Sequence, residues 1–317
     1  MSRAATRMRR AVSAAETNIQ WTQGTWLLDE VSSVSEVNSF ASVYTGALTQ
    51  PGITGLSIRV RWSDIDGGNY AILDAAKAIT DSVGSKLAVR FVAGRWTPAA
   101  YRGRTHVVTY NSVDYDVPLP FQPDGTSGNP QFEAGYASAV QDLAAWCRSN
   151  GVRVLHLPWY GRLWAEYDNG ADVQSQTGYT VEAWRAAHQV LLNTGLSAAG
   201  NDLAVEYAAS GHPNAGTGTP NANIYLVLNT GADQVGDLSP YLFHQSNGWQ
   251  NTGDSRATSR VIFGMQSYGV ELWTGTTWAE AYQTLNSLGA AYCEVYRESF
   301  QGEPVSQLLT EAAAFKQ

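Results

Sequence analysis

Three glutamates stand near the ends of segments whose composition predicts β-strands. Glu166 lies in the run LHLPWYGRLWAEYDNG (155–170), and Glu206 and Glu294 lie in DLAVEYAAS and AAYCEVYR. Two carboxyl groups that flank a glycosidic bond can cleave it, at about 5 Å apart for retention of configuration and farther apart for inversion. The three glutamates are therefore the candidate catalytic groups, with Glu166 as the acid and Glu294 or Glu206 as the nucleophile or base.

The neighbours of these carboxylates in the sequence favour opposite protonation states. Trp159, Trp164 and Tyr167 surround Glu166, and an apolar environment raises the pKa of a carboxyl group so that it can act as an acid. Arginines nearby would instead keep the second carboxylate ionised. The candidates for that role are Arg59, Arg61 and Arg90.

Short β-rich runs alternate with amphipathic helical segments along the chain, which predicts a (β/α)8 barrel of the TIM type. The strands are expected at 19–27, 55–62, 86–94, 152–160, 202–210, 223–229, 260–268 and 290–297. The helices are expected at 35–48, 71–84, 132–151, 180–195, 278–289 and 305–317. No helix is evident after the sixth strand, so a doubly wound open sheet is the alternative, although no GxGxxG motif follows a strand.

The chain is expected to form one barrel domain over residues 19–317, preceded by a flexible basic arm over residues 1–18. An insertion follows the third strand at residues 102–130. Its alternating runs HVVTY and VDYDV around Asn111-Ser112 predict a β-hairpin.

Alternation along each strand separates side chains that face the helices from side chains that face the barrel axis. The residues expected at the axis are Arg59, Arg61, Arg90, His156, Glu206, Asn229, Gln266, Glu294 and Tyr296. Such a polar interior is either an Arg–Glu network that fixes the barrel register or a pocket for a polyhydroxylated ligand. In the second interpretation the ligand-positioning residues are Arg59, Arg61, Arg90, His156, Trp159, Gln266 and Tyr296.

Two positions depart from the best-known clan of barrel glycosidases, in which the acid ends strand four and the nucleophile ends strand seven. Strand four ends here in Pro158-Trp159-Tyr160, with Glu166 farther along, and strand seven carries Gln266. An amide cannot act as the nucleophile, so either Glu294 takes that role or the protein does not catalyse hydrolysis.

The composition excludes several classes of function. Twenty basic and 28 acidic residues give a net charge of −8, which opposes binding to nucleic acid or to an anionic membrane. No apolar run reaches the roughly 18 to 20 residues that cross a bilayer.

The two cysteines, Cys147 and Cys293, lack metal-ligand spacing and are expected to be buried. No GxSxG, HExxH, P-loop or CxxC motif occurs, so no cofactor or metal is predicted.

The runs GLSIRVRWSDID, AVRFVAGRWTPA, VPLPFQPDGT, LAAWCRSNGVRVLHLPWYGRLWAEYDNG and DLAVEYAASG resemble minor tail proteins encoded by phages of actinobacteria. The resemblance covers roughly residues 50 to 210 and is most specific in LHLPWYGRLWAE. It implies a glycoside-hydrolase-like barrel in the virion tail that binds or cleaves a host cell-envelope polysaccharide. The basic arm would then either contact other tail subunits or be a disordered tail without a role. The alternative is a non-catalytic carbohydrate or receptor binder, or a structural tail protein.

Overall fold

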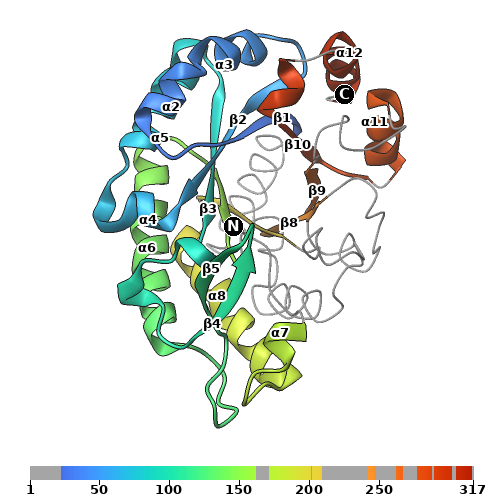
Figure 1. Ribbon diagram of the computed structural model, residues 1–317. Coiled ribbons are helices and arrows are strands. Elements are labelled where there is room, and N and C mark those ends of the chain that lie inside the picture. Colours follow the sequence, from blue (N-terminus) through green and yellow to red (C-terminus); the bar gives the residue numbers. More distant parts are fainter. Residues whose placement is uncertain are drawn as a thin grey trace, which may run out of the picture.

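The structure, a computed structural model, describes residues 23–161, 171–200, 202–208, 242–247, 262–266, 277–287, 289–301 and 305–315. For 242–247 and 262–266 it describes the backbone alone. Eight of the strands lie in one sheet (Figure 1). They are β1 (Gly24–Glu30), β2 (Ile53–Arg61), β3 (Lys86–Val92), β6 (Val154–Leu157), β7 (Ala204–Ala208), β8 (Leu242–Asn247), β9 (Ile262–Gln266) and β10 (Tyr292–Tyr296).

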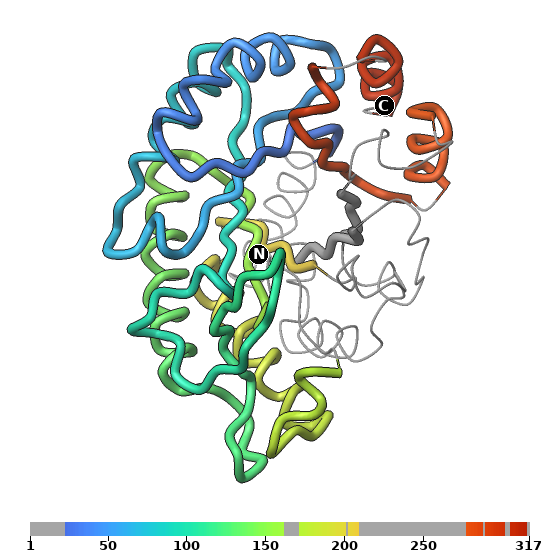
Figure 2. The backbone as a smooth tube through the Cα atoms, in the orientation of Figure 1, coloured from blue at the N-terminus to red at the C-terminus, as the bar shows by residue number. Residues whose placement is uncertain are grey.

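These strands close into a parallel barrel in the order β1-β10-β9-β8-β7-β6-β3-β2. The first and last strands complete the ring, because β1 pairs with β10 on one side and with β2 on the other. Figure 2 shows the consequence, with the blue beginning and the red end of the described chain lying side by side. The open doubly wound sheet is therefore excluded.

Helices follow β1, β2, β3, β6, β9 and β10 within the described residues. They are α2 (Val34–Ser39), α3 (Ala41–Leu48), α4 (Trp62–Ile65), α5 (Ala71–Ser82), α6 (Pro130–Ser149), α7 (Ala171–Gln174), α8 (Val181–Ala199), α11 (Trp278–Ser287) and α12 (Val305–Phe315). Short 3-10 turns are η1 (Asp66–Gly68), η2 (Gly94–Trp96), η3 (Ala99–Tyr101) and η7 (Arg297–Phe300).

Local sequence signals set several helix ends. The Thr180 side chain accepts a hydrogen bond from the Ala183 N–H at 3.0 Å and so caps the start of α8. Gly84, Gly151 and Gly289 follow α5, α6 and α11 with φ between 66° and 68°, in the left-handed region that glycine adopts without strain.

A two-stranded antiparallel ribbon of β4 (Thr105–Tyr110) and β5 (Val113–Pro118) lies between β3 and α6. Its turn residues Asn111 and Ser112 have φ of 50° and 62°, as a two-residue hairpin turn requires. The base of this segment is fastened to α6 by Asn129, which is 1% exposed. The Asn129 Nδ2 donates to the carbonyl oxygens of Arg102, Arg104 and Leu119 at 2.9, 2.9 and 3.2 Å.

The apolar layer between barrel and helices contains the strand residues that the alternation predicts to face outward. Leu56, Ile58 and Val60 of β2 are all 0% exposed and belong to one cluster with residues of the surrounding helices. Both cysteines are buried and free, as predicted. Burial raises the pKa of the Cys293 thiol to about 12, so the group stays protonated at neutral pH.

The sixth strand is not where the sequence pattern predicts it. The barrel uses β8 (Leu242–Asn247), which pairs with β7 and β9, whereas the prediction was residues 223–229. That run has the β-branched and apolar composition of a strand, but strand propensity does not fix which segment pairs with its neighbours in the ring. Residues 223–229, including Asn229, lie outside the described ranges, as does the basic arm.

Candidate functional site

The barrel interior is built in two levels, which differ in polarity. At the amino-terminal end lie five apolar residues, each at most 2% exposed. They are Trp26, Ala88, Val154, Ala204 and Tyr292. The residues two positions later in four of these strands are polar, and alternation turns them toward the same axis. They are Arg90, His156, Glu206 and Glu294.

These four polar residues, called the axial ring below, contact one another directly. Arg90 Nη2 donates to Glu206 Oε1 at 3.2 Å and also to Glu294 Oε2. On its other side, Glu206 Oε1 contacts His156 Nδ1. The second ring nitrogen, His156 Nε2, lies 3.3 Å from Glu294 Oε1. Each carboxylate therefore meets both basic side chains.

The axial ring is almost completely removed from solvent. Its members are between 1% and 3% exposed. Burying separate charges in this way costs several kcal/mol each unless they are paired. Each carboxylate is paired with the Arg90 guanidinium, which provides the pairing that burial of a charge demands.

Burial also sets the proton affinity of one carboxylate. Loss of hydration raises the pKa of Glu206, while the adjacent His156 and Arg90 act to lower it. A carboxylate with a raised pKa accepts a proton more readily than an exposed one. This is the property that a general base requires.

A second polar group, called the rim below, lies at the carboxyl ends of β1, β2 and β10. Arg59 donates to the Tyr296 hydroxyl at 3.2 Å and to Glu30 at 3.4 Å, and Arg61 donates to Glu30 Oε1 at 3.1 Å. The Glu30 and Arg61 side chains are 18% and 31% exposed. These two side chains are thus better placed than the axial ring to touch a ligand that arrives from this end.

Glu30 is a site residue that the sequence analysis did not select. The first strand was expected to end at residue 27, so Glu30 fell in a loop. The signal was present in the run TWLLDE, whose alternation continues to Glu30 and places it on the same face as Trp26.

Judged by distance alone, three residues of the axial ring could act together as ligands of a metal ion. Ligand atoms of His156, Glu206 and Glu294 lie within 4.8 Å of one another. The set nevertheless fits a cation poorly. Arg90 already donates to an oxygen of each glutamate, and a divalent ion between these oxygens would lie beside the guanidinium charge.

The other candidate residues are placed differently. Trp159 is 0% exposed, and its ring centroid lies 4.2 Å from that of Tyr207 and 5.6 Å from that of His188. Its indole nitrogen donates to the Ala208 carbonyl at 2.6 Å. Trp159 thus packs between the barrel and α8, whereas it was expected to position a ligand. Gln266 ends β9 without a described side chain, and Glu166 lies outside the described residues.

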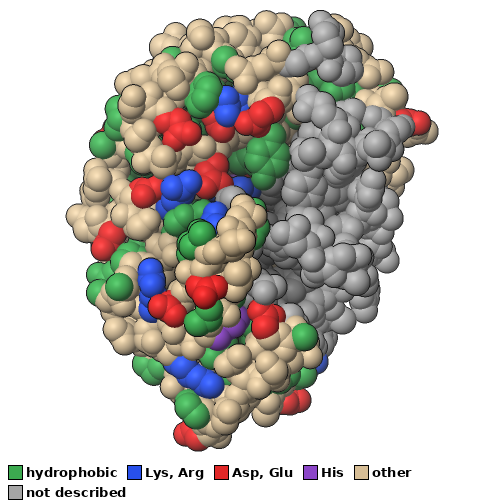
Figure 3. All heavy atoms as spheres, viewed as in Figure 1, with side chains coloured by type: hydrophobic (Ala, Val, Ile, Leu, Met, Phe, Trp, Pro, Cys, Tyr) green, Lys and Arg blue, Asp and Glu red, His purple; other side chains and the backbone are tan. Residues whose placement is uncertain are grey.

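Charged side chains of both signs lie on the outer surface. On the described part of the face shown in Figure 3, acidic and basic side chains are interspersed. None of the described helices has the length and apolar character needed to span a membrane.

No family model matches the sequence, and no curated protein matches it. Solved structures do match. A D-allulose 3-epimerase from Methylomonas sp. in complex with D-allulose has a TM-score of 0.50 and 14% identity over 87% of this chain and 83% of its own. A 3-keto-D-glucoside 4-epimerase from E. coli has a TM-score of 0.50 and 9% identity over 92% of this chain and 98% of its own.

These comparisons correct the resemblance to minor tail proteins. The matching structures described above are sugar epimerases and not phage tail proteins, and no sequence match supports a tail protein. The prediction of a virion glycoside hydrolase is therefore wrong. At these identities the likeness establishes the fold alone: this chain is an α/β protein with the parallel barrel that sugar epimerases also have.

Proposed function

We propose that the protein is a sugar epimerase or isomerase that moves a proton on the carbon next to a sugar carbonyl. The observation that carries this proposal is the axial ring, in which two buried carboxylates share one guanidinium and one imidazole. The activities of the two sugar epimerases described above support the choice of a sugar as substrate.

The reaction needs a base, an acid and a positive charge. In the proposed reaction Glu206, whose pKa burial raises, removes the proton from the carbon next to the carbonyl. The electron pair moves to the carbonyl oxygen and gives an enediolate. Glu294, in its protonated form, returns a proton to the opposite face of that carbon, which inverts its configuration.

Arg90 supplies the positive charge. Its guanidinium contacts both carboxylates and remains charged at any working pH. In the proposed reaction it donates a hydrogen bond to the developing oxyanion, where a preorganised donor in a site with little water contributes most.

The rim would position the substrate. Glu30, Arg61 and Tyr296 offer carboxylate, guanidinium and phenol groups at the carboxyl ends of their strands, where α/β barrels place their active sites. In the same proposal the whole chain is a (β/α)8 barrel, with residues 102–130 as an insertion after the third strand.

Deuterium exchange tests the proposed reaction. The protein is incubated with D-allulose and with a panel of other ketoses in D2O, and NMR spectra follow the loss of the C–H signal next to the carbonyl. We expect exchange with the wild-type protein and a loss of at least about 100-fold in Glu206→Gln and Glu294→Gln, since general acid–base catalysis contributes roughly 10²–10⁴-fold.

The matched control is Glu182→Gln, which removes an exposed carboxylate from the first turn of α8 and should leave the rate unchanged. Exchange that survives both axial variants, or no exchange with any ketose, would contradict the proposal. Saturable sugar binding without exchange would instead identify a binding protein.

A further inference from the structure

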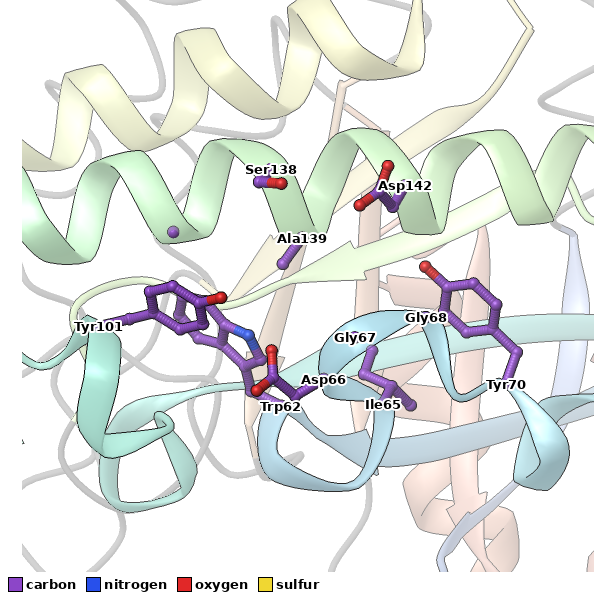
Figure 4. A pocket seen from close by; sticks show the side chains of 11 residues that line it. Trp62, Ile65, Asp66, Gly67, Gly68, Tyr70, Tyr101, Ser138, Ala139 and Asp142 are labelled. Atoms are coloured by element: carbon purple, nitrogen blue, oxygen red, sulfur yellow. The ribbon is translucent and has the colours of Figure 1, made fainter.

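A pocket of about 100 Å³ lies outside the barrel, between α6 and the segment that contains α4 and η1. Figure 4 shows Ser138, Ala139 and Asp142 on α6 along one side, and Trp62, Asp66 and Gly67 on the opposite side. Tyr70 and Tyr101 stand at its two ends. The pocket shares no residue with the axial ring or the rim.

The floor of the pocket holds a buried hydrogen-bond donor without an acceptor. Trp62 is 0% exposed, and its Nε1 has no hydrogen-bond partner. In Figure 4 the indole nitrogen is directed toward the space between η1 and α6. A buried N–H that lacks an acceptor costs free energy, so an acceptor atom that enters the pocket would be stabilised there.

The Trp62 ring is held firmly in this orientation. It stacks on Tyr101 with ring centroids 5.4 Å apart and an interplanar angle of 14°. Phe91 and Phe132 pack edge-on against it, each with centroids 5.6 Å away. Because these contacts fix the ring, the indole N–H cannot turn to an acceptor elsewhere, and the donor remains aimed at the pocket.

The charges of the other residues that line the pocket determine which class of ligand it can bind. The described residues that line the pocket include Asp66 and Asp142 but no Lys, Arg or His, so an anionic ligand would be repelled. An ammonium group would suit the carboxylates, but it has no acceptor to offer Trp62. A hydroxyl group accepts from the indole N–H and also donates to a carboxylate.

The phenol groups add to this preference. Burial and the nearby Asp142 raise the pKa of Tyr70 to about 12, so its hydroxyl keeps its proton and can donate as well as accept. Tyr70 and Tyr101 are both half-buried, and aromatic rings in this state offer apolar surface to the C–H bonds of a sugar ring.

We propose that this pocket is a second binding site for a neutral hydroxylated ligand. The ligand places a hydroxymethyl group or one edge of a sugar ring in the pocket. The pocket is too small for a whole hexose, so the rest of the ligand would lie over Tyr70 or Tyr101. The proposal does not depend on the reaction at the axial ring.

The indole N–H of Trp62 provides a direct test in NMR spectra of the 15N-labelled protein. Its resonance is assigned as the one that disappears in Trp62→Phe. The probes are glycerol, methyl β-D-glucopyranoside and methyl β-D-galactopyranoside, with methylammonium chloride as the ammonium probe. We expect at least one hydroxylated probe to shift the Trp62 resonance with saturation in the millimolar range, and methylammonium chloride to leave it in place.

Two variants on the exposed side of α6 complete the test without altering the core. Ser138→Leu fills the pocket and should abolish the shift, whereas Gln141→Leu makes the same kind of change at an exposed residue that does not line the pocket. No saturable shift with any hydroxylated probe overturns the proposal. An equal shift in Ser138→Leu, or an equal shift with methylammonium chloride, also overturns it. Loss of ketose exchange would leave these outcomes unaffected.

Discussion

At the scale of single residues, His188 illustrates how burial decides the charge of a side chain. It is 0% exposed, its Nδ1 donates to the Trp184 carbonyl at 2.8 Å, and its ring stacks on that of Trp184 at 4.0 Å. Loss of hydration lowers the pKa of His188 from 6.5 to about 3. The imidazole is therefore neutral in the folded protein and packs as an aromatic ring.

This pKa predicts how stability depends on pH. Above pH 6.5 neither the folded nor the unfolded state protonates His188, so the group imposes no penalty. Below pH 6.5 the unfolded state takes up the proton and the folded state does not, so stability falls until the pH reaches about 3. Relative to His188→Phe, the wild-type protein should lose about 2 kcal/mol of unfolding free energy between pH 7 and pH 5.

Urea unfolding followed by tryptophan fluorescence at the two pH values measures this difference. The comparison with the variant cancels the contributions of other titrating groups. An unfolding free-energy difference that stays constant between pH 7 and pH 5 would show that the imidazole titrates alike in both states.

Arg90 permits a second prediction at this scale, because its charge takes the place that a cation would need. Divalent manganese should not raise the Tm of the wild-type protein. Arg90→Met removes the guanidinium and leaves two buried carboxylates beside His156. This variant should be about 3–5 kcal/mol less stable, and manganese should raise its Tm with saturation.

Thermal melting with and without manganese measures the effect. Arg90→Lys, which keeps the positive charge, is the control and should gain no response to the metal. A wild-type Tm that rises with manganese would show that the cation and Arg90 share the ring after all.

At the scale of elements, the side-chain amide of Asn129 holds the segment between β3 and α6 in place. Asn129 holds three carbonyl oxygens of this segment with its Nδ2, and its Oδ1 accepts from the Phe132 N–H at the start of α6. Asn129→Ala would leave these buried carbonyl groups unpaired and remove the helix cap. We expect a loss of about 3 kcal/mol of unfolding free energy and faster proteolysis within residues 102–128.

A matched substitution at the other end of α6 is Asn150→Ala. Asn150 makes one side-chain hydrogen bond, to the Trp146 carbonyl at 2.9 Å, and its loss should cost less than about 1 kcal/mol. Thermal melting and limited proteolysis compare the two variants. Equal destabilisation by both would mean that the Asn129 amide does not anchor the segment.

The sequence predicts which side chains face the barrel axis wherever the strands themselves are placed correctly. It located Arg90, His156, Glu206 and Glu294 on one axis, since a strand turns every second side chain to the same face. Trp159 was selected as a ligand-positioning residue for its aromatic ring and not by alternation, and its ring packs instead against Tyr207 and His188. Contacts between arginines and glutamates at the axis could be predicted, because buried charges must be paired. Which of these residues contact one another could not be predicted, since that depends on the stagger of neighbouring strands.

At the scale of the whole molecule, the sequence predicted the barrel class from the order of its elements but not every strand that composes it. The helices expected at 71–84 and 132–151 correspond to α5 and α6, because their periodicity and glycine signals agree. The position of β8 depends on pairing with β7 and β9, which a single segment does not encode. The resemblance to tail proteins rested on short runs of residues, which did not determine function.

The apolar lower level of the barrel has a consequence for how molecules reach its interior. Gly55 lies so close to Trp26 that an added Cβ would come within 2.5 Å of the indole ring, so the ring fills the end of the barrel beside a position that only glycine can occupy. Together with Tyr292, Ala88, Val154 and Ala204, Trp26 fills the described part of the amino-terminal end of the barrel. Among the described residues, this closure leaves the carboxyl-terminal end of the barrel as the expected route of water and ligands to the axial ring. A larger residue at Gly55 would displace Trp26 and should open a second route.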